Sequence, residues 1–149
     1  MRLDVGSGCK YSADVNIDID RSLPVDVVAD VQHLPFKDDV FNVVTCFHTL
    51  EHLHNPQAAL DELVRVSRKV VHIKVPWRFS WTARSDPSHK HIFCSSWFKE
   101  YAKSRGLSVA CKMHLDPERS PHIGLCFPFA FEISVWLWSK RGKTDLCKL

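Results

Sequence analysis

The chain has 149 residues, of which 45% are hydrophobic and 25% charged, and its formal net charge is +3 with histidine neutral. These values are typical of one folded domain, residues 1–149, and so small a positive charge does not by itself indicate nucleic-acid binding. No apolar run is long enough to span a bilayer, and the residues from Met1 to Asp4 lack the apolar core of a secretion signal. We therefore expect a cytoplasmic protein with no membrane partner.

Strands dominate the first third of the chain. Apolar or alternating runs predict four of them, at residues 3–5, 15–20, 25–31 and 42–47. The first ends in the turn Gly6-Ser7-Gly8, where two glycines allow a tight bend and a close approach of the backbone to a ligand.

The remainder of the chain is predicted to contain helices as well as strands. Asn55 is a good N-cap and Pro56 suits the first position of a helix. Ser95 or Ser96 can cap a second helix, for which Gly106 is the natural stop. Three further strands are predicted at residues 70–75, 107–115 and 131–139.

Strands that alternate with helices indicate an α/β fold with a largely parallel sheet. The connections at residues 9–14 and 21–24 are too short for an ordinary parallel crossover, which takes a dozen or more residues. We therefore expect the first helices to be short or missing, so that part of one sheet face lacks helical cover. A homodimer partner, a partner subunit or the C-terminal segment would cover it.

The glycine turn does not match a nicotinamide-dinucleotide fingerprint. Tyr11 stands where a third glycine would be needed, and Asp18 follows Gly8 after ten residues instead of about twenty. Asp18 and Asp30 each come at the end of a predicted strand, at the edge where α/β sheets bind ligands. Such carboxylates can accept hydrogen bonds from ribose hydroxyls or an adenine amine, although aspartates also end strands for purely structural reasons.

The run at residues 26–56, DVVADVQHLPFKDDVFNVVTCFHTLEHLHNP, resembles the class I S-adenosylmethionine-dependent methyltransferases of the type 11 group. LDVGSG is similar to that group's glycine motif, and SDPSHKHIFCSSWFKEYAKSRGL to a later segment. The brief loop between the glycine motif and the next strand is similar to that of a short subgroup of this type 11 group. The resemblance implies a reduced Rossmann-like methyltransferase fold, α/β, with a mostly parallel seven-stranded sheet whose last strand is antiparallel.

The resemblance also implies S-adenosyl-L-methionine as the cofactor. The implied contacts are Asp4 with its amino group, Gly6, Ser7 and Gly8 beside its methionine part, Asp18 with the ribose, Asp30 and Val31 with the adenine, and Phe47 and His48 near the sulfonium. Cys9 departs from the group's third small residue. The missing first helix removes an N-terminus whose dipole would favour the cofactor's carboxylate.

Methyl transfer needs an acceptor aligned with the sulfonium, exclusion of water and, for a hydroxyl or ammonium, removal of a proton. His48, His52 and His89 are the candidate bases, with His91 close by, although a packing role has more weight for His52. If residues 48–52 were helical, His48, Glu51 and His52 would face one way and could bind a divalent metal. That signal is weak, and no metal ligand is assigned.

The expected function is S-adenosylmethionine-dependent methyl transfer to an unidentified acceptor, for which a small molecule is favoured over RNA or protein. Residues 116–128 are the segment expected to face the acceptor. The main alternative is a non-catalytic subunit that binds S-adenosylmethionine or supports a partner. Another kind of nucleotide-binding domain also remains open.

Overall fold

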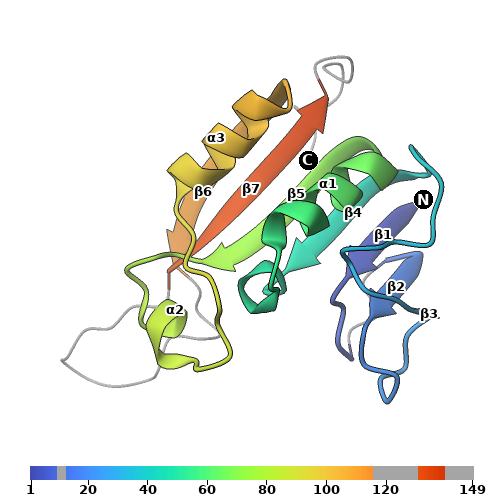
Figure 1. Ribbon diagram of the computed structural model, residues 1–149, viewed down its shortest axis with the longest axis horizontal. Coiled ribbons are helices and arrows are strands. Elements are labelled where there is room, and N and C mark those ends of the chain that lie inside the picture. The colour runs from blue at the N-terminus through green and yellow to red at the C-terminus, as the bar shows by residue number, and fades with distance from the viewer. Residues whose placement is uncertain (10–12, 116–130, 140–149) are drawn as a thin grey trace.

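The computed structural model describes residues 1–9, 13–115 and 131–139. Seven strands form one sheet in the order β3-β2-β1-β4-β5-β7-β6 (Figure 1). The strands are β1 (Arg2–Val5), β2 (Val15–Asp18), β3 (Val27–Val28), β4 (Phe41–Phe47), β5 (Ser67–Pro76), β6 (Leu107–Leu115) and β7 (Phe131–Ser139). The helical elements are a 3₁₀ turn η1 (Leu50–His52), α1 (Pro56–Val66), α2 (Trp81–Ser85) and α3 (Ser95–Ser104).

Strands β1 to β5 pair in parallel, whereas β7 runs antiparallel to both β5 and β6. The α/β class and the mostly parallel seven-stranded sheet with an antiparallel last strand are therefore confirmed. Parallel pairing brings the ends of β1, β2, β4 and β5 to one side of the sheet, where antiparallel β7 begins. We call this side the carboxyl edge, and it is where an open α/β sheet binds ligands.

Both longer helices cover the same face of the sheet. In α1, Asn55 caps the helix by accepting the Ala58 N–H at 3.1 Å, and Leu60 and Leu63 are fully buried against β4 and β5. In α3, Phe98 is buried in the same core. Burial of each such side chain contributes about 1.5–3 kcal/mol. The core therefore lies between this sheet face and the two helices (Figure 1).

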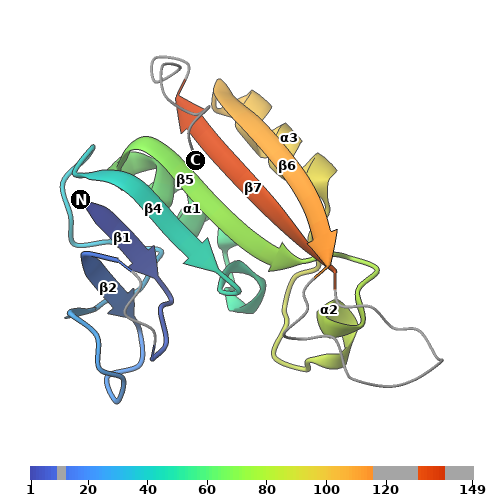
Figure 2. The same ribbon diagram turned by 180° about the vertical axis from the view of Figure 1, so that it is seen from behind.

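Among the described residues, the opposite face of the sheet carries no helix (Figure 2). Side chains that alternate with the core point toward it, among them Thr45 on β4 and His72 on β5. His72 stacks on Trp136 of β7 with ring centroids 4.6 Å apart. The expected reduction of the fold is confirmed for the described residues, since none of their helical elements precedes Leu50.

Several element bounds differ from the sequence-based expectations. Strand β2 ends at Asp18 because its carboxylate accepts the Asp20 N–H and turns the chain. Strand β3 has only two residues because Asp30 likewise accepts the Gln32 N–H and begins a turn. Strand β5 begins at Ser67, directly after α1, instead of residue 70.

The helical elements differ from the expectations in two respects, the cap of α3 and the presence of η1 and α2. The N-cap of α3 is Cys94, which makes no side-chain cap bond, so the expected serine cap is wrong. The left-handed Gly106 after α3 confirms the expected stop. Neither η1 nor α2 was expected, because each is shorter than two helical turns and has little periodicity of its own. Within the described part of the chain, no helix has the length and apolar character needed to cross a membrane.

Candidate functional site

The glycine turn lies at the carboxyl edge and is held directly by the neighbouring strand. The N–H groups of Gly6 and Ser7 both donate to the Ile17 carbonyl of β2, at 2.9 and 3.1 Å. Gly6 and Gly8 both have positive φ, +68° and +57°, which glycine adopts without strain. A Cβ on Gly6 would lie 2.1 Å from Thr49 Oγ1, whereas a Cβ on Gly8 would meet no atom of the described residues within 4 Å. The turn is therefore closely packed at Gly6 and open at Gly8.

Two aspartates adjoin this turn. Asp18 Oδ2 accepts the Gly8 N–H at 3.1 Å, and Asp18 Oδ1 accepts the Asp20 N–H at 3.1 Å. Each oxygen keeps a further lone pair, because a carboxylate oxygen can accept two hydrogen bonds. Asp30 accepts the Gln32 backbone N–H at 2.9 Å, so its carboxylate also stabilises the turn after β3.

One small cavity brings most of these residues together. It has a volume of about 60 Å³, so it encloses only part of a nucleoside-sized ligand. Its lining residues are Val5, Gly6, Asp18, Ile19, Ala29, Asp30, Val31, Thr49 and Leu53. Of the expected cofactor residues, Gly6, Asp18, Asp30 and Val31 thus share one cavity, and Gly8 borders it through its bond to Asp18.

The remaining expected cofactor residues lie outside that cavity. Asp4 and Ser7 are buried, and Asp4 Oδ1 accepts a hydrogen bond from Thr45 Oγ1 at 2.6 Å. Phe47 ends β4, where the Lys74 ammonium lies 5.2 Å from its ring centroid. His48 follows with a positive φ of +51°, and its N–H donates to the Lys74 carbonyl at 2.9 Å. A non-glycine residue held in this conformation is strained, and such strain is frequent at functional sites.

Glu132 is a buried acid that the sequence reasoning missed, and its carboxylate contacts three cationic or titratable side chains. Glu132 Oε2 lies 3.1 Å from His48 Nε2, and Glu132 Oε1 lies 2.9 Å from Lys74 Nζ and contacts His114 Nε2. Burial raises the pKa of Glu132, but hydrogen bonds from Lys74 and His114 outweigh burial, so its pKa falls below the ordinary value. We call Glu132 with His48, Lys74 and His114 the Glu132 cluster.

Only tertiary structure assembles this cluster. Glu132 is a lone acid at the start of an apolar strand, and its register opposite Pro76 and His114 brings it to the carboxyl edge. The one signal in the sequence was an acidic residue at a position that the strand pattern expects to be buried. Burying an unpaired charge is costly, so such a residue must have partners.

The metal set that a helix over residues 48–52 would have allowed, His48, Glu51 and His52, is not formed. The 3₁₀ turn begins at Leu50, so His48 lies outside it, and its ring reaches Glu132. His48 Nδ1 is 3.5 Å from Glu51 Oε1. His52 instead meets His89, with ring centroids 4.8 Å apart. Residues 116–128, expected to face the acceptor, lie outside the described residues.

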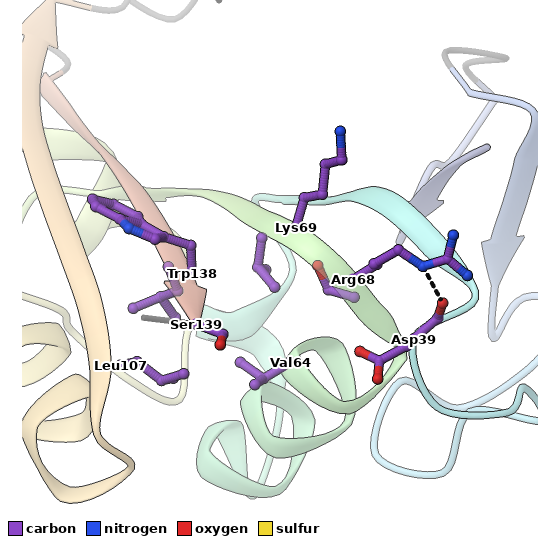
Figure 3. Close-up of a pocket in the computed structure, with 10 residues that line it drawn as sticks. Asp39, Val64, Arg68, Lys69, Leu107, Trp138 and Ser139 are labelled. Atoms are coloured by element: carbon purple, nitrogen blue, oxygen red, sulfur yellow. Dashed lines mark hydrogen bonds between the residues drawn. The ribbon is translucent and has the colours of Figure 1, made fainter. Parts of the chain in front are cut away.

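A larger cavity, of about 320 Å³, lies at the other side of the sheet (Figure 3). It lies between the start of β5 and the end of β7, and Val64 and Leu107 contribute apolar lining. Arg68 Nε donates to the Asp39 carbonyl at its rim, at 3.1 Å. This is the edge opposite to the one where parallel strands end, so we place the functional site at the carboxyl edge despite the greater volume here.

Comparison with known proteins finds similarity to methyltransferases. A family model described as a methyltransferase domain matches residues 3–73. Demethylmenaquinone methyltransferase of Mycobacterium tuberculosis (strain H37Rv) is 50% identical over 42 residues, which are 28% of this chain and 18% of that protein. The match therefore spans less than a fifth of the relative's length.

Two solved structures resemble the whole architecture. The YcgJ protein of Bacillus subtilis superposes with a TM-score of 0.71 at 15% identity, over 93% of this chain and 91% of that one. A methyltransferase from Thermotoga maritima, described as S-adenosylmethionine-dependent and a possible histamine N-methyltransferase, gives 0.70 at 13% identity, over 93% and 82%. The fold is thus the Rossmann-like methyltransferase fold, and the resemblance of this chain to the class I S-adenosylmethionine-dependent methyltransferases of type 11 is confirmed.

Proposed function

We propose that this chain binds S-adenosylmethionine at the carboxyl edge and transfers its methyl group to a small molecule. The observation that carries the proposal is the cavity shared by Gly6, Asp18, Asp30 and Val31 at that edge. A left-handed glycine turn beside two carboxylates suits a ligand with ribose hydroxyls, an amine-bearing base and a flexible polar tail.

The contacts follow from the groups that remain available. Asp18 holds the ribose hydroxyls with the lone pairs that Gly8 and Asp20 leave unused. Asp30 and the backbone of Val31 receive the adenine. The open space beside Gly8 admits the methionine part past the turn, and Phe47 and His48 lie beyond the end of β4 toward the sulfonium. Asp4 and Ser7 support the turn from its buried side.

The Glu132 cluster supports methyl transfer to an acceptor that must lose a proton. His48 joins the end of β4 to Glu132, and His114 approaches the same carboxylate from β6. An ionised carboxylate that holds one ring nitrogen of a histidine orients the ring and stabilises its protonated form. We propose that His48 or His114 takes the acceptor's proton, with Glu132 as the positioning residue.

A small acceptor is supported by a curated relative with a partial match, whose name refers to demethylmenaquinone. The test uses labelled S-adenosylmethionine and a cell extract separated by size. We expect label in the small-molecule fraction with the wild-type chain and a loss of about 10²-fold or more with His48→Asn or His114→Asn. His54→Asn, at an exposed side chain, is the matched control. Label in RNA or protein instead would refute the small acceptor.

The uncovered sheet face favours a second candidate, a non-catalytic subunit that binds S-adenosylmethionine or supports a partner chain. The face presents Thr45, His72 and Trp136 without helical cover in the described residues. In its S-adenosylmethionine-binding form, this candidate predicts cofactor binding in a calorimetric titration but no label transfer in any fraction until a partner is added. The two candidates therefore differ in the transfer assay and agree in the titration.

A further inference from the structure

Three side chains that the proposed methyl transfer does not use come together beside η1. Glu51 and His52 belong to η1, and His89 lies in the loop after α2. One ligand atom from each of the three lies within 4.8 Å of the other two. A carboxylate and two imidazoles at this spacing are the donor set of many sites for divalent transition metals.

The surroundings of Glu51 give the first reason to infer a bound cation. Its side chain is 1% exposed, and neither carboxylate oxygen accepts a hydrogen bond from any described residue. The His48 ring nitrogen 3.5 Å away is too distant for a good hydrogen bond. A buried carboxylate without hydrogen bonds is costly, and a bound cation removes that cost.

One ring nitrogen of each histidine has an oxygen neighbour that leaves the other nitrogen available to a metal ion. His89 Nδ1 lies 3.4 Å from the Ala83 carbonyl, which can only accept, so the tautomer that uses this contact has its proton on Nδ1 and its lone pair on Nε2. Ser88 Oγ donates its one proton to Asp86 Oδ1 at 2.5 Å. It therefore accepts from His52 Nδ1, 3.0 Å away, which leaves the lone pair of His52 on Nε2.

This hydrogen bonding is the outer-shell pattern of metal-bound histidines, in which the other ring nitrogen donates to an oxygen that fixes the ring. The backbone fixes the same geometry, because the Lys90 and His91 N–H groups donate to the Glu51 carbonyl at 2.7 and 3.2 Å. Asp86 Oδ2, 3.6 Å from His89 Nε2, adds a second negative charge beside the site.

We propose that Glu51, His52 Nε2 and His89 Nε2 bind one divalent transition-metal ion of the Zn²⁺ type. The ion joins η1 to the loop after α2. This assignment replaces the sequence-based one, in which no metal ligand was named and His52 and His89 were candidate bases. The proposal does not depend on methyl transfer, since none of the three ligands lines the small cavity that contains Gly6, Asp18 and Asp30.

The test is equilibrium dialysis of the chelator-treated chain against Zn²⁺, with Co²⁺ as a spectroscopic probe. We expect one tight equivalent per chain and a Co²⁺ absorption spectrum characteristic of mixed nitrogen and oxygen ligands. His52→Ala and His89→Ala should each weaken binding by well over tenfold, and Ser88→Ala by about tenfold through loss of the outer-shell bond.

His91→Ala is the control, because its ring lies in the same loop and contacts only the His54 carbonyl and Phe93 among the described residues. It should bind Zn²⁺ as the wild type does. Two results would overturn the proposal: no tight equivalent in the wild type, which would make the His52–His89 contact mere ring packing, or tight binding that survives both His52→Ala and His89→Ala. Urea unfolding of each variant without metal tests whether folding is retained. His89→Ala is expected to disturb folding least, because His89 lies in a loop.

Discussion

Replacing Gly6 or Gly8 by alanine should separate the stability of the glycine turn from its binding role. Both residues have positive φ, for which a non-glycine residue costs about 1–2 kcal/mol. At Gly6 the new Cβ would also lie 2.1 Å from Thr49 Oγ1 and 2.8 Å from Thr49 Cγ2. Overpacking of this kind costs a further 1–3 kcal/mol or so. We therefore expect Gly6→Ala to lower the free energy of unfolding by about 2–5 kcal/mol, and Gly8→Ala by about 1–2 kcal/mol.

Urea unfolding followed by circular dichroism measures both values. Thr49→Ala in the Gly6→Ala background should recover the steric part, about 1–3 kcal/mol, and a double-mutant cycle isolates this coupling. Gly8→Ala should instead lower affinity for S-adenosylmethionine, because its Cβ enters the open space that we assign to the cofactor. Equal losses of stability in Gly6→Ala and Gly8→Ala, with no rescue by Thr49→Ala, would refute the reasoning.

Three further predictions concern stability. Burial, with the Lys74 charge, lowers the pKa of His72 from 6.5 to about 4, so the unfolded chain binds a proton more readily. The contribution of His72 is then complete above pH 6.5 and is lost as the pH falls toward 4, and His72→Phe should remove about 1–2 kcal/mol of this pH dependence in urea titrations; an unchanged slope would contradict the buried, neutral ring. The Arg65 guanidinium donates to Glu62, Asp38 and the carbonyls of Leu34 and Phe36. Arg65→Lys should therefore lower the free energy of unfolding by about 1–3 kcal/mol in the same assay. A loss near zero would show that the several donors of the guanidinium are not needed. Asn55→Ala should cost about 1 kcal/mol through loss of the α1 cap, whereas Asn55→Asp should be nearly neutral.

Much of the fold was predictable because its signals are local. The cap at Asn55 and the stop at Gly106 mark helix ends through neighbouring residues, and the strands predicted at residues 107–115 and 131–139 coincide with β6 and β7. The bounds of β2 and β3 were wrong because Asp18 and Asp30 turn the chain with their own carboxylates. Periodicity does not report that competition between side chain and backbone.

The same distinction between local and long-range signals applies to the candidate site. The glycine turn was located from a short motif, Asp18 and Asp30 from their places at the ends of predicted strands, and all three line one cavity. Glu132 was missed because its partner His48 is 84 residues away and only the register of β7 joins them. His52 and His89, 37 positions apart in the chain, were found as separate histidines. Their contact depends on the loop after α2, which no pattern in the sequence predicts.

The measurement that tests the central claim most directly is a calorimetric titration of the wild type, Asp18→Ala and Asp30→Ala with S-adenosylhomocysteine. We expect each variant to bind about 1–3 kcal/mol more weakly, which is about 5- to 150-fold in Kd, with unfolding free energies that show intact folds. Unchanged affinity in both folded variants, or a wild type that binds plain nucleotides equally well, would contradict the proposed cofactor site.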